Sequence, residues 1–268
     1  MTQKARTQKA RTQRAMTQSK CAIITGSATG VGAAVAIELS GQGYNVLINY
    51  NKSEAEAEQT RAAVENAGGQ AIVLQGDVAD DAACVAMVEA VISEWGRLDV
   101  LVNNAGMTSF TGVDNWDALT GEVFSRIYDV NVVGAFQMVR AARDALCANG
   151  GGSIVNVSSI AGSLGIGSSV PYIASKGAMN SMTLHLARQL APDIRVNAVC
   201  PGLITSRWFR DGIGEDGFQK VKSGYESSVP LQRACTPEDV AGAIVWLATA
   251  TSVITGELLL MDGGKHLG

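Results

Sequence analysis

Short runs of Val, Ile and Leu alternate along the chain with longer segments in which apolar residues recur every three or four positions. Runs of the first kind predict buried β-strands, and segments of the second kind predict amphipathic helices. Because parallel strands need helical crossovers between them, this alternation predicts an α/β fold, a doubly wound parallel sheet of about seven strands with helices on both faces. The predicted strands are 21–25, 45–50, 71–78, 98–102, 154–157, 194–199 and 257–262.

The helical part of the pattern contains two irregularities that bear on function. Helical patterns over 117–131 and 132–148 meet at Asn131, which stands among valines. A buried asparagine needs hydrogen-bond partners, so Asn131 either ties two helical turns together or presents a water to a site. The segment 203–229 is polar and contains several glycines and aromatic residues, which predicts an irregular substrate lid. Other helices are predicted at 33–39, 80–95, from about 171 onward and at 236–250.

Residues 1–20 differ in composition from the rest of the chain. They repeat with a period of five and contain six basic residues and no acidic one. A five-residue period fits no single helical face, so we predict a disordered basic tail, followed by one domain over 21–268. The alternative is a tail that contacts nucleic acid or anionic lipid. The remaining sequence is acidic, which argues against nucleic acid as the main partner.

Composition also limits the location of the protein and its metal chemistry. No apolar run reaches the roughly 18 to 20 residues that a membrane span needs, and no signal-peptide pattern follows the basic start. The five cysteines are widely spaced and form no Cys-x-x-Cys pair, which predicts reduced, mostly buried thiols in a cytoplasmic protein. His185 and His266 lack metal-ligand spacing, so no metal site is expected. Because no apolar run is long enough to span a membrane, no membrane partner is expected either.

A glycine-rich turn follows the first predicted strand and precedes a helix. In this context glycines let the backbone approach a pyrophosphate, and the helix N-terminus offers unpaired N–H groups. The alternative is a tight turn that serves only helix–strand packing. We predict a nucleotide-binding turn formed by Gly26, Ser27, Thr29, Gly30, Val31 and Gly32.

The end of the second strand bears on which dinucleotide is bound. NAD-selective sites place an acid there, where it holds the ribose 2′-hydroxyl. Here Tyr50, Asn51, Lys52 and Ser53 come before the first acid, Glu54. Lys52 and Ser53 suit a 2′-phosphate, so NADP(H) is favoured over NAD(H). The alternative is a solvated turn with an ordinary lysine.

Further candidate residues stand at the carboxyl ends of other predicted strands, where doubly wound sheets bind their ligands. They are Asp77 and Val78 at the end of the third strand, Asn104, Ala105 and Gly106 after the fourth, and Pro201 and Gly202 after the sixth.

A phenol and an ammonium are expected together on the helix that begins near Pro171. Tyr172 and Lys176 are four residues apart and therefore share a helical face. The cation favours the phenolate, so the tyrosine can exchange a proton nearer neutral pH than its ordinary pKa of about 10 allows. Ser159, at the end of the preceding strand, can bring a hydroxyl to the same place. Chance pairs of this kind are common, so the pair gains meaning only from the motifs around it.

The chain from about 21 to 264 resembles the short-chain dehydrogenase/reductase family, in its 3-oxoacyl-reductase-like branch. The resemblance implies a single Rossmann-type catalytic domain that transfers a hydride between a nicotinamide and a small ketone or secondary alcohol. It rests on motifs in this order: Thr25-Gly26-x-x-x-Gly30-x-Gly32, Asp77, Asn103-Asn104-Ala105-Gly106, Asn131, Ser159, Tyr172-x-x-x-Lys176 and Pro201-Gly202.

The resemblance also implies catalytic roles. Tyr172 resembles the general acid of carbonyl reduction and the base of alcohol oxidation. Lys176 would lower the pKa of Tyr172 and hold the nicotinamide ribose, and Ser159 would hydrogen-bond the substrate oxygen. Asn131 would anchor a water that passes protons onward.

Contacts to the cofactor and between subunits are implied in the same way. Asp77 and Val78 would meet the adenine, Asn104 would position the cofactor, and Ile204 would reach the carboxamide. The family often has threonine at the position of Ser206. NADP-preferring members often carry arginine at the position of Thr29, which weakens the NADP prediction. A homotetramer or homodimer is expected, built from helices near 117–148 and 172–190 and the C-terminal strand.

The substrate is the least defined part of this prediction. Members that act on acyl carrier protein need basic residues at the site mouth, where this chain has Gly150 and Asp193. A free small ketone or alcohol is therefore favoured. An NAD-dependent alcohol or sugar dehydrogenase is the alternative within the family, and a non-catalytic nucleotide sensor is the alternative outside enzymes.

Overall fold

The computed structural model describes residues 19–111 and 115–268, so the predicted tail lies almost entirely outside the described residues. In the described part, seven parallel strands form one sheet in the order β3-β2-β1-β4-β5-β6-β7. The α/β prediction with about seven strands is confirmed. The strands are β1 (Cys21–Ile24), β2 (Asn45–Tyr50), β3 (Ala71–Gln75), β4 (Val100–Asn103), β5 (Gly152–Val157), β6 (Ile194–Pro201) and β7 (Leu258–Met261).

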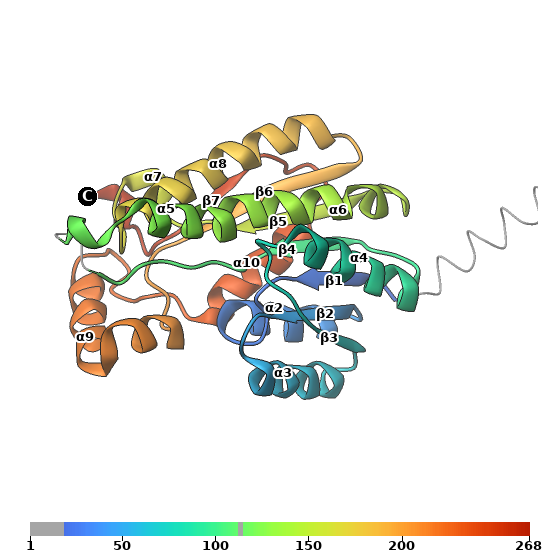
Figure 1. Ribbon diagram of the computed structural model, residues 1–268, viewed down its shortest axis with the longest axis horizontal. Coiled ribbons are helices and arrows are strands. Elements are labelled where there is room, and N and C mark those ends of the chain that lie inside the picture. Colours follow the sequence, from blue (N-terminus) through green and yellow to red (C-terminus); the bar gives the residue numbers. More distant parts are fainter. Residues whose placement is uncertain (1–18, 112–114) are drawn as a thin grey trace, which may run out of the picture.

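Helices cover both faces of the sheet (Figure 1). No helix in residues 19–111 and 115–268 is long and apolar enough to cross a membrane. One face carries α2 (Gly30–Gly41), α3 (Glu54–Asn66) and α10 (Pro237–Thr249). The other carries α4 (Asp81–Trp95), α5 (Gly121–Tyr128), α6 (Ala135–Cys147) and α8 (Val170–Leu190).

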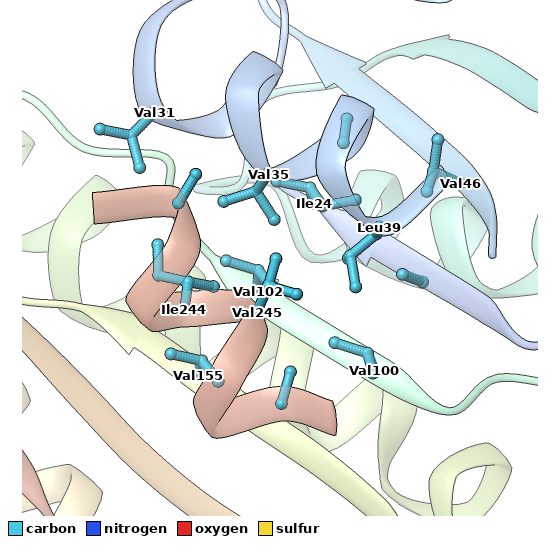
Figure 2. Close-up of a cluster of buried hydrophobic side chains, with 14 of the residues drawn as sticks. Ile24, Val31, Val35, Leu39, Val46, Val100, Val102, Val155, Ile244 and Val245 are labelled. Atoms are coloured by element: carbon cyan, nitrogen blue, oxygen red, sulfur yellow. The ribbon is translucent and has the colours of Figure 1, made fainter. Parts of the chain in front are cut away.

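Alternate residues of each strand enter the two halves of the core. On β1, Ile24 faces the half under α2 and α10, and Ile23 faces the half under α4 and α6. Figure 2 shows the first half, where Val35 of α2 and Ile244 of α10 meet the sheet. Burying each such side chain contributes about 1.5–3 kcal/mol, and burial on both faces is typical of a parallel sheet.

A buried ion pair secures the end of the sheet where β1 begins. The Arg97 guanidinium donates to both carboxylate oxygens of Asp99, at 2.9 and 2.6 Å, and the two side chains are only 9% and 10% exposed. The backbone N–H of Cys21 donates to the same carboxylate at 2.8 Å. Asp99 therefore fixes the start of β1 beside the start of β4.

The helix junction at Asn131 is a π-helical turn, η2 (Asp129–Gly134), which joins α5 to α6 without a break. The sequence predicted two helices that meet here. In the structure the junction keeps the two helices in one line, and Asn131 lies inside it, fully buried.

The segment predicted as an irregular lid is instead helical, and that prediction is wrong in this respect. Helix α9 (Arg207–Ser227) spans most of it, with a kink at Gly214, where φ is 74°. Phe218 is completely buried, and this burial outweighs the weak helix propensity of the glycines. Figure 1 shows α9 apart from the other helices, beside the C-terminus. Shorter elements are α7 (Ala161–Leu164), η1 (Trp116–Ala118) and η3 (Lys265–Leu267).

Candidate active site

The strand order reverses between β1 and β4. The chain runs outward from β1 to β2 and β3, then returns to β4 on the other side of β1. Such a reversal opens a crevice at the carboxyl ends of the strands. A cavity of about 890 Å³ lies there, at the upper end of the usual volume range of small-molecule sites.

Most of the residues predicted from sequence line this one cavity, although they are spread along the chain from Gly26 to Ser206. Those in its wall are Gly26, Thr29, Gly30, Val31, Asn51, Lys52, Asp77, Val78, Asn104, Ala105, Gly106, Ser159, Tyr172, Lys176, Pro201, Gly202, Ile204 and Ser206. Five predicted residues do not line it: Ser27, Gly32, Tyr50, Ser53 and Asn131.

The glycine-rich turn is open toward the cavity, and hydrogen bonds from Asn104 fix its backbone. Gly26 and Gly30 have φ of 61° and 59°, a conformation that favours glycine. A Cβ on Gly30 would meet nothing within 4 Å, so the turn leaves free space there. The Asn104 amide donates to the carbonyls of Thr25 and Gly26, both at 2.9 Å. Because α2 begins at Gly30, its first N–H groups border this space, and the turn fits a pyrophosphate.

Ser27 and Gly32 shape the turn without facing the cavity. The Ser27 hydroxyl donates to the Ile24 carbonyl at 2.6 Å. A Cβ on Gly32 would lie 2.6 Å from the Asn104 amide nitrogen, so only glycine lets that amide reach the turn. Ser27 thus acts through a hydrogen bond, and Gly32 acts through close packing with the Asn104 amide.

Asn49, which the sequence analysis did not select, takes the place expected of Tyr50. The side-chain Oδ1 of Asn49 accepts from the Gly26 N–H at 3.0 Å, and the side-chain amide nitrogen of Asn49 donates to the Gly76 carbonyl at 3.0 Å. Tyr50 instead faces the core and is 8% exposed. The strand alternation contained the signal, because Asn49 is polar within an apolar strand.

An acidic residue and an arginine meet at the β2–β3 end of the cavity. Asp77 accepts from the Arg126 guanidinium at 2.5 Å and from the Asn51 amide at 3.2 Å. Partial burial by itself raises the pKa of Asp77, but these donors and the Ala79 N–H together outweigh it and leave the pKa lowered. Arg126 belongs to α5, 49 residues from Asp77, so no local motif could have pointed to it. Lys52 lines the same end of the cavity.

The predicted Ser159, Tyr172 and Lys176 side chains converge. The Lys176 ammonium donates to the Val157 carbonyl at 2.8 Å and lies 5.6 Å from the centre of the Tyr172 ring. Ser159 accepts from the Ala161 N–H at 3.1 Å and donates to the Pro201 carbonyl at 3.4 Å, and it lines the cavity together with Tyr172.

The pKa values of this pair differ from the prediction. Burial raises the pKa of Tyr172 to about 12, and the hydrogen bond with Ser159 lowers it only in part. Burial also lowers the pKa of Lys176 to about 8. The expectation that the lysine brings the phenol toward neutral pH is wrong for the protein alone, because desolvation of both groups dominates.

Asn131 joins the two sides of the catalytic region. Its side chain accepts from the Met107 N–H at 2.8 Å and donates to the Met107 carbonyl at 3.0 Å. Its amide also donates to the Ser175 hydroxyl at 2.9 Å, which in turn donates to the Tyr172 carbonyl at 2.8 Å. Asn131 thus ties the loop after β4 to the first turns of α8.

Three aromatic rings gather beside the catalytic tyrosine candidate. Trp208 lies 6.1 Å from Tyr172 between ring centres, and Phe110 and Phe209 lie 5.6 and 5.7 Å from Trp208. Phe110 follows β4, whereas Trp208 and Phe209 begin α9. The sequence pattern of 203–229 indicated the aromatic residues there, but no pattern pointed to Phe110.

Comparison with known proteins gives matches over nearly the whole chain. A family model described as enoyl-(acyl carrier protein) reductase matches residues 26–266. A Streptomyces violaceoruber protein named as a ketoacyl reductase of the granaticin polyketide synthase is 41% identical over 250 residues, which are 93% of this chain and 97% of that protein. L-rhamnose 1-dehydrogenase (NAD(P)(+)) of a Sphingomonas strain is 36% identical over 93% of this chain and 97% of that protein.

Solved structures match the chain over a similar length. The crystal structure of a protein named as a short-chain dehydrogenase/reductase from Burkholderia xenovorans matches with a TM-score of 0.85 and 39% identity, over 93% of this chain and 99% of that chain. The described strand order, the cavity and these relatives lead to one conclusion. The chain belongs to the short-chain dehydrogenase/reductase family, in its 3-oxoacyl-reductase-like branch, and is an NAD(P)-dependent oxidoreductase.

Proposed function

We propose that this enzyme reduces a ketone, of the 3-oxoacyl type or similar, with NADP(H) as its preferred cofactor. The observation that carries the proposal is the convergence of Ser159, Tyr172 and Lys176 on the cavity that begins at the glycine-rich turn. These groups supply a hydroxyl, a protonated phenol and a cation beside one another, which is what addition of hydride to a carbonyl requires.

The cofactor, when bound, supplies the hydride. The Tyr172 phenol donates its proton to the carbonyl oxygen, and its raised pKa keeps that proton in place at neutral pH. The Ser159 hydroxyl donates a hydrogen bond to the same oxygen. The Lys176 ammonium stabilises the negative charge that develops there and on the phenol as the proton leaves. The products are the secondary alcohol and the oxidised nicotinamide.

The same arrangement indicates which part of the cavity holds each part of the cofactor. In this proposal the turn between Gly26 and Gly32 holds the pyrophosphate, and Asp77 and Val78 hold the adenosine. Ile204 and Ser206 lie at the nicotinamide. Lys52, in the cavity wall, contacts the 2′-phosphate. Ser53 does not line the cavity, so the phosphate contact depends on Lys52.

Replacing Lys52 with alanine is expected to remove most of the preference for NADPH. A lysine–phosphate contact that is partly exposed to solvent gives roughly tenfold to thirtyfold discrimination, and salt weakens it. The preference is measured by titrating the wild type and Lys52→Ala with NADPH and with NADH and following the fluorescence. Lys20→Ala is the matched control, because Lys20 does not line the cavity. Its ammonium lies over the Tyr44 ring, next to the first residue of β1. Tighter NADH binding by the wild type would contradict the proposal.

The rate of ketone reduction is expected to fall as the pH rises through about 8. Lys176 is charged below its pKa of about 8 and neutral above it, whereas the Tyr172 phenol stays protonated over the whole range. A profile of kcat/KM from pH 6 to 10 tests this. The Lys176→Arg variant should show no such fall in its remaining activity, because a guanidinium stays charged. A flat wild-type profile would show that the lysine charge is not needed.

A further inference from the structure

The ring cluster beside Tyr172 is the largest feature of the cavity that the proposed chemistry does not use. The chain has five phenylalanines, four tryptophans and five tyrosines. Among them, Phe110, Tyr172, Trp208, Phe209 and Tyr225 all line this cavity. Aromatic side chains are thus concentrated at one place in a chain that has few.

The rings are arranged so that one more ring can join them. Phe110 meets Trp208 and Phe209 edge to face, with centres 5.6 and 5.4 Å apart, and Trp208 meets Phe209 in the same way. These separations lie within the range in which aromatic pairs attract each other. Trp208 is still 40% exposed, so a large aromatic surface remains beside the reacting phenol for a ligand to cover.

The cluster is held in position from both sides. The Phe110 ring lies against the backbone of α9, where a Cβ on Gly212 would overlap it. At the other end of α9, the Tyr225 hydroxyl donates to the Asp262 carbonyl at 2.7 Å. The rings therefore form a wall that exists before a substrate binds, which reduces the cost of ordering the site.

Among the described residues near the cluster, two polar groups already have partners. The Ser168 hydroxyl is hydrogen-bonded to Thr108 at 2.6 Å. Arg207, the charged residue at the start of α9, is paired with Glu56 at 2.8 Å and with Asp211 at 3.0 Å. A polyol substrate would leave hydroxyl groups without partners here, which is costly. An uncharged aromatic ring has no hydroxyl groups and therefore loses no hydrogen bonds here.

We infer that the substrate is an uncharged ketone that carries an aromatic or fused aromatic ring, which packs against Trp208, Phe110 and Phe209 while its carbonyl meets Tyr172 and Ser159. This inference rests on the proposed reduction at the same site. The new alcohol forms as described above, with hydride from the reduced nicotinamide and a proton from Tyr172. The ring system itself is unchanged.

A pair of ketones with the same carbon skeleton tests the inference. 2-Tetralone has an aromatic ring fused to the ring that bears its ketone, and 2-decalone is its fully saturated analogue. The wild type should show a kcat/KM for 2-tetralone about tenfold above that for 2-decalone, a difference that one aromatic contact can supply. Oxidation of L-rhamnose, measured in parallel, covers the sugar alternative.

Variants of Trp208 locate the effect. Trp208→Leu should lose about tenfold in kcat/KM for 2-tetralone and less than about threefold for 2-decalone, whereas Trp208→Phe should keep most of the wild-type preference. Trp246→Leu is the matched control, because Trp246 is 46% exposed on α10 and does not line the cavity. Thermal melting of each variant checks that it folds.

The outcomes separate the two proposals. Equal rates for both ketones, or equal losses in Trp208→Leu, would overturn the aromatic inference and leave the ketone reduction standing. Faster turnover of L-rhamnose than of either ketone would overturn both. Quenching of Trp208 fluorescence by 2-naphthol, present in the wild type and lost in Trp208→Phe, would support the ring contact independently of turnover.

Discussion

Replacing Tyr172 with phenylalanine should lower kcat for ketone reduction by about 10²- to 10⁴-fold, the usual contribution of a positioned acid. The variant keeps the ring, so the contact with Trp208 at 6.1 Å between ring centres is retained. Only the phenolic hydroxyl group, and with it the acidic proton, is lost. Single-turnover rates with NADPH and a ketone measure the effect.

Cofactor affinity is the control for this variant. In our proposal the pyrophosphate is held at the glycine-rich turn and the adenosine at Asp77, so NADPH should bind Tyr172→Phe within about threefold of the wild type. A matched loss of affinity and rate would point to a collapsed site instead. Retention of more than about a tenth of the wild-type rate would exclude Tyr172 as the acid.

Replacing Asp99 with alanine should lower the free energy of unfolding by about 3–5 kcal/mol, because it leaves the buried Arg97 guanidinium without this carboxylate. The Cys21 N–H loses its acceptor in the same step. A loss of this size is a large part of the roughly 5–15 kcal/mol that stabilises a typical domain. Denaturation with urea at neutral pH measures it.

An exposed pair supplies the comparison. Arg143 and Asp144 also form an ion pair, at 2.8 Å, but their side chains are 58% and 85% exposed. Asp144→Ala should therefore change the free energy of unfolding by less than about 1 kcal/mol. Similar effects of the two substitutions would show that burial does not set the importance of the Arg97–Asp99 pair.

The strands and the residues that follow them could be predicted from sequence because both depend on local patterns. Runs such as 45–50 and 154–157 are mostly apolar and rich in Val and Ile, and parallel strands bring their carboxyl ends to one edge of the sheet. That rule alone placed Asp77, Asn104 and Ser159 on the same cavity. The helix start at Thr236 was equally local, since its capping contacts lie within three residues.

Other parts of the site depend on contacts between segments that no local pattern links. Arg126 of α5 contacts Asp77, which follows β3, although 49 residues separate the two in sequence. Helix α9 forms around the buried Phe218 in spite of its glycines. The pKa of Tyr172 follows from burial, whereas sequence spacing revealed only the nearby lysine.

The π-helical turn at Asp129–Gly134 makes the site depend on helical phase as well as on residue identity. Such a turn is the form that one extra residue takes inside an α-helix. Successive residues of a helix are about 100° apart around its axis, so deleting one residue from the turn would rotate α5 against α6. Arg126 and Asn131 would then point away from Asp77 and Met107. A deletion of a single codon can thus dismantle both ends of the cavity in a protein whose sequence still contains every serine, tyrosine and lysine of the catalytic motif.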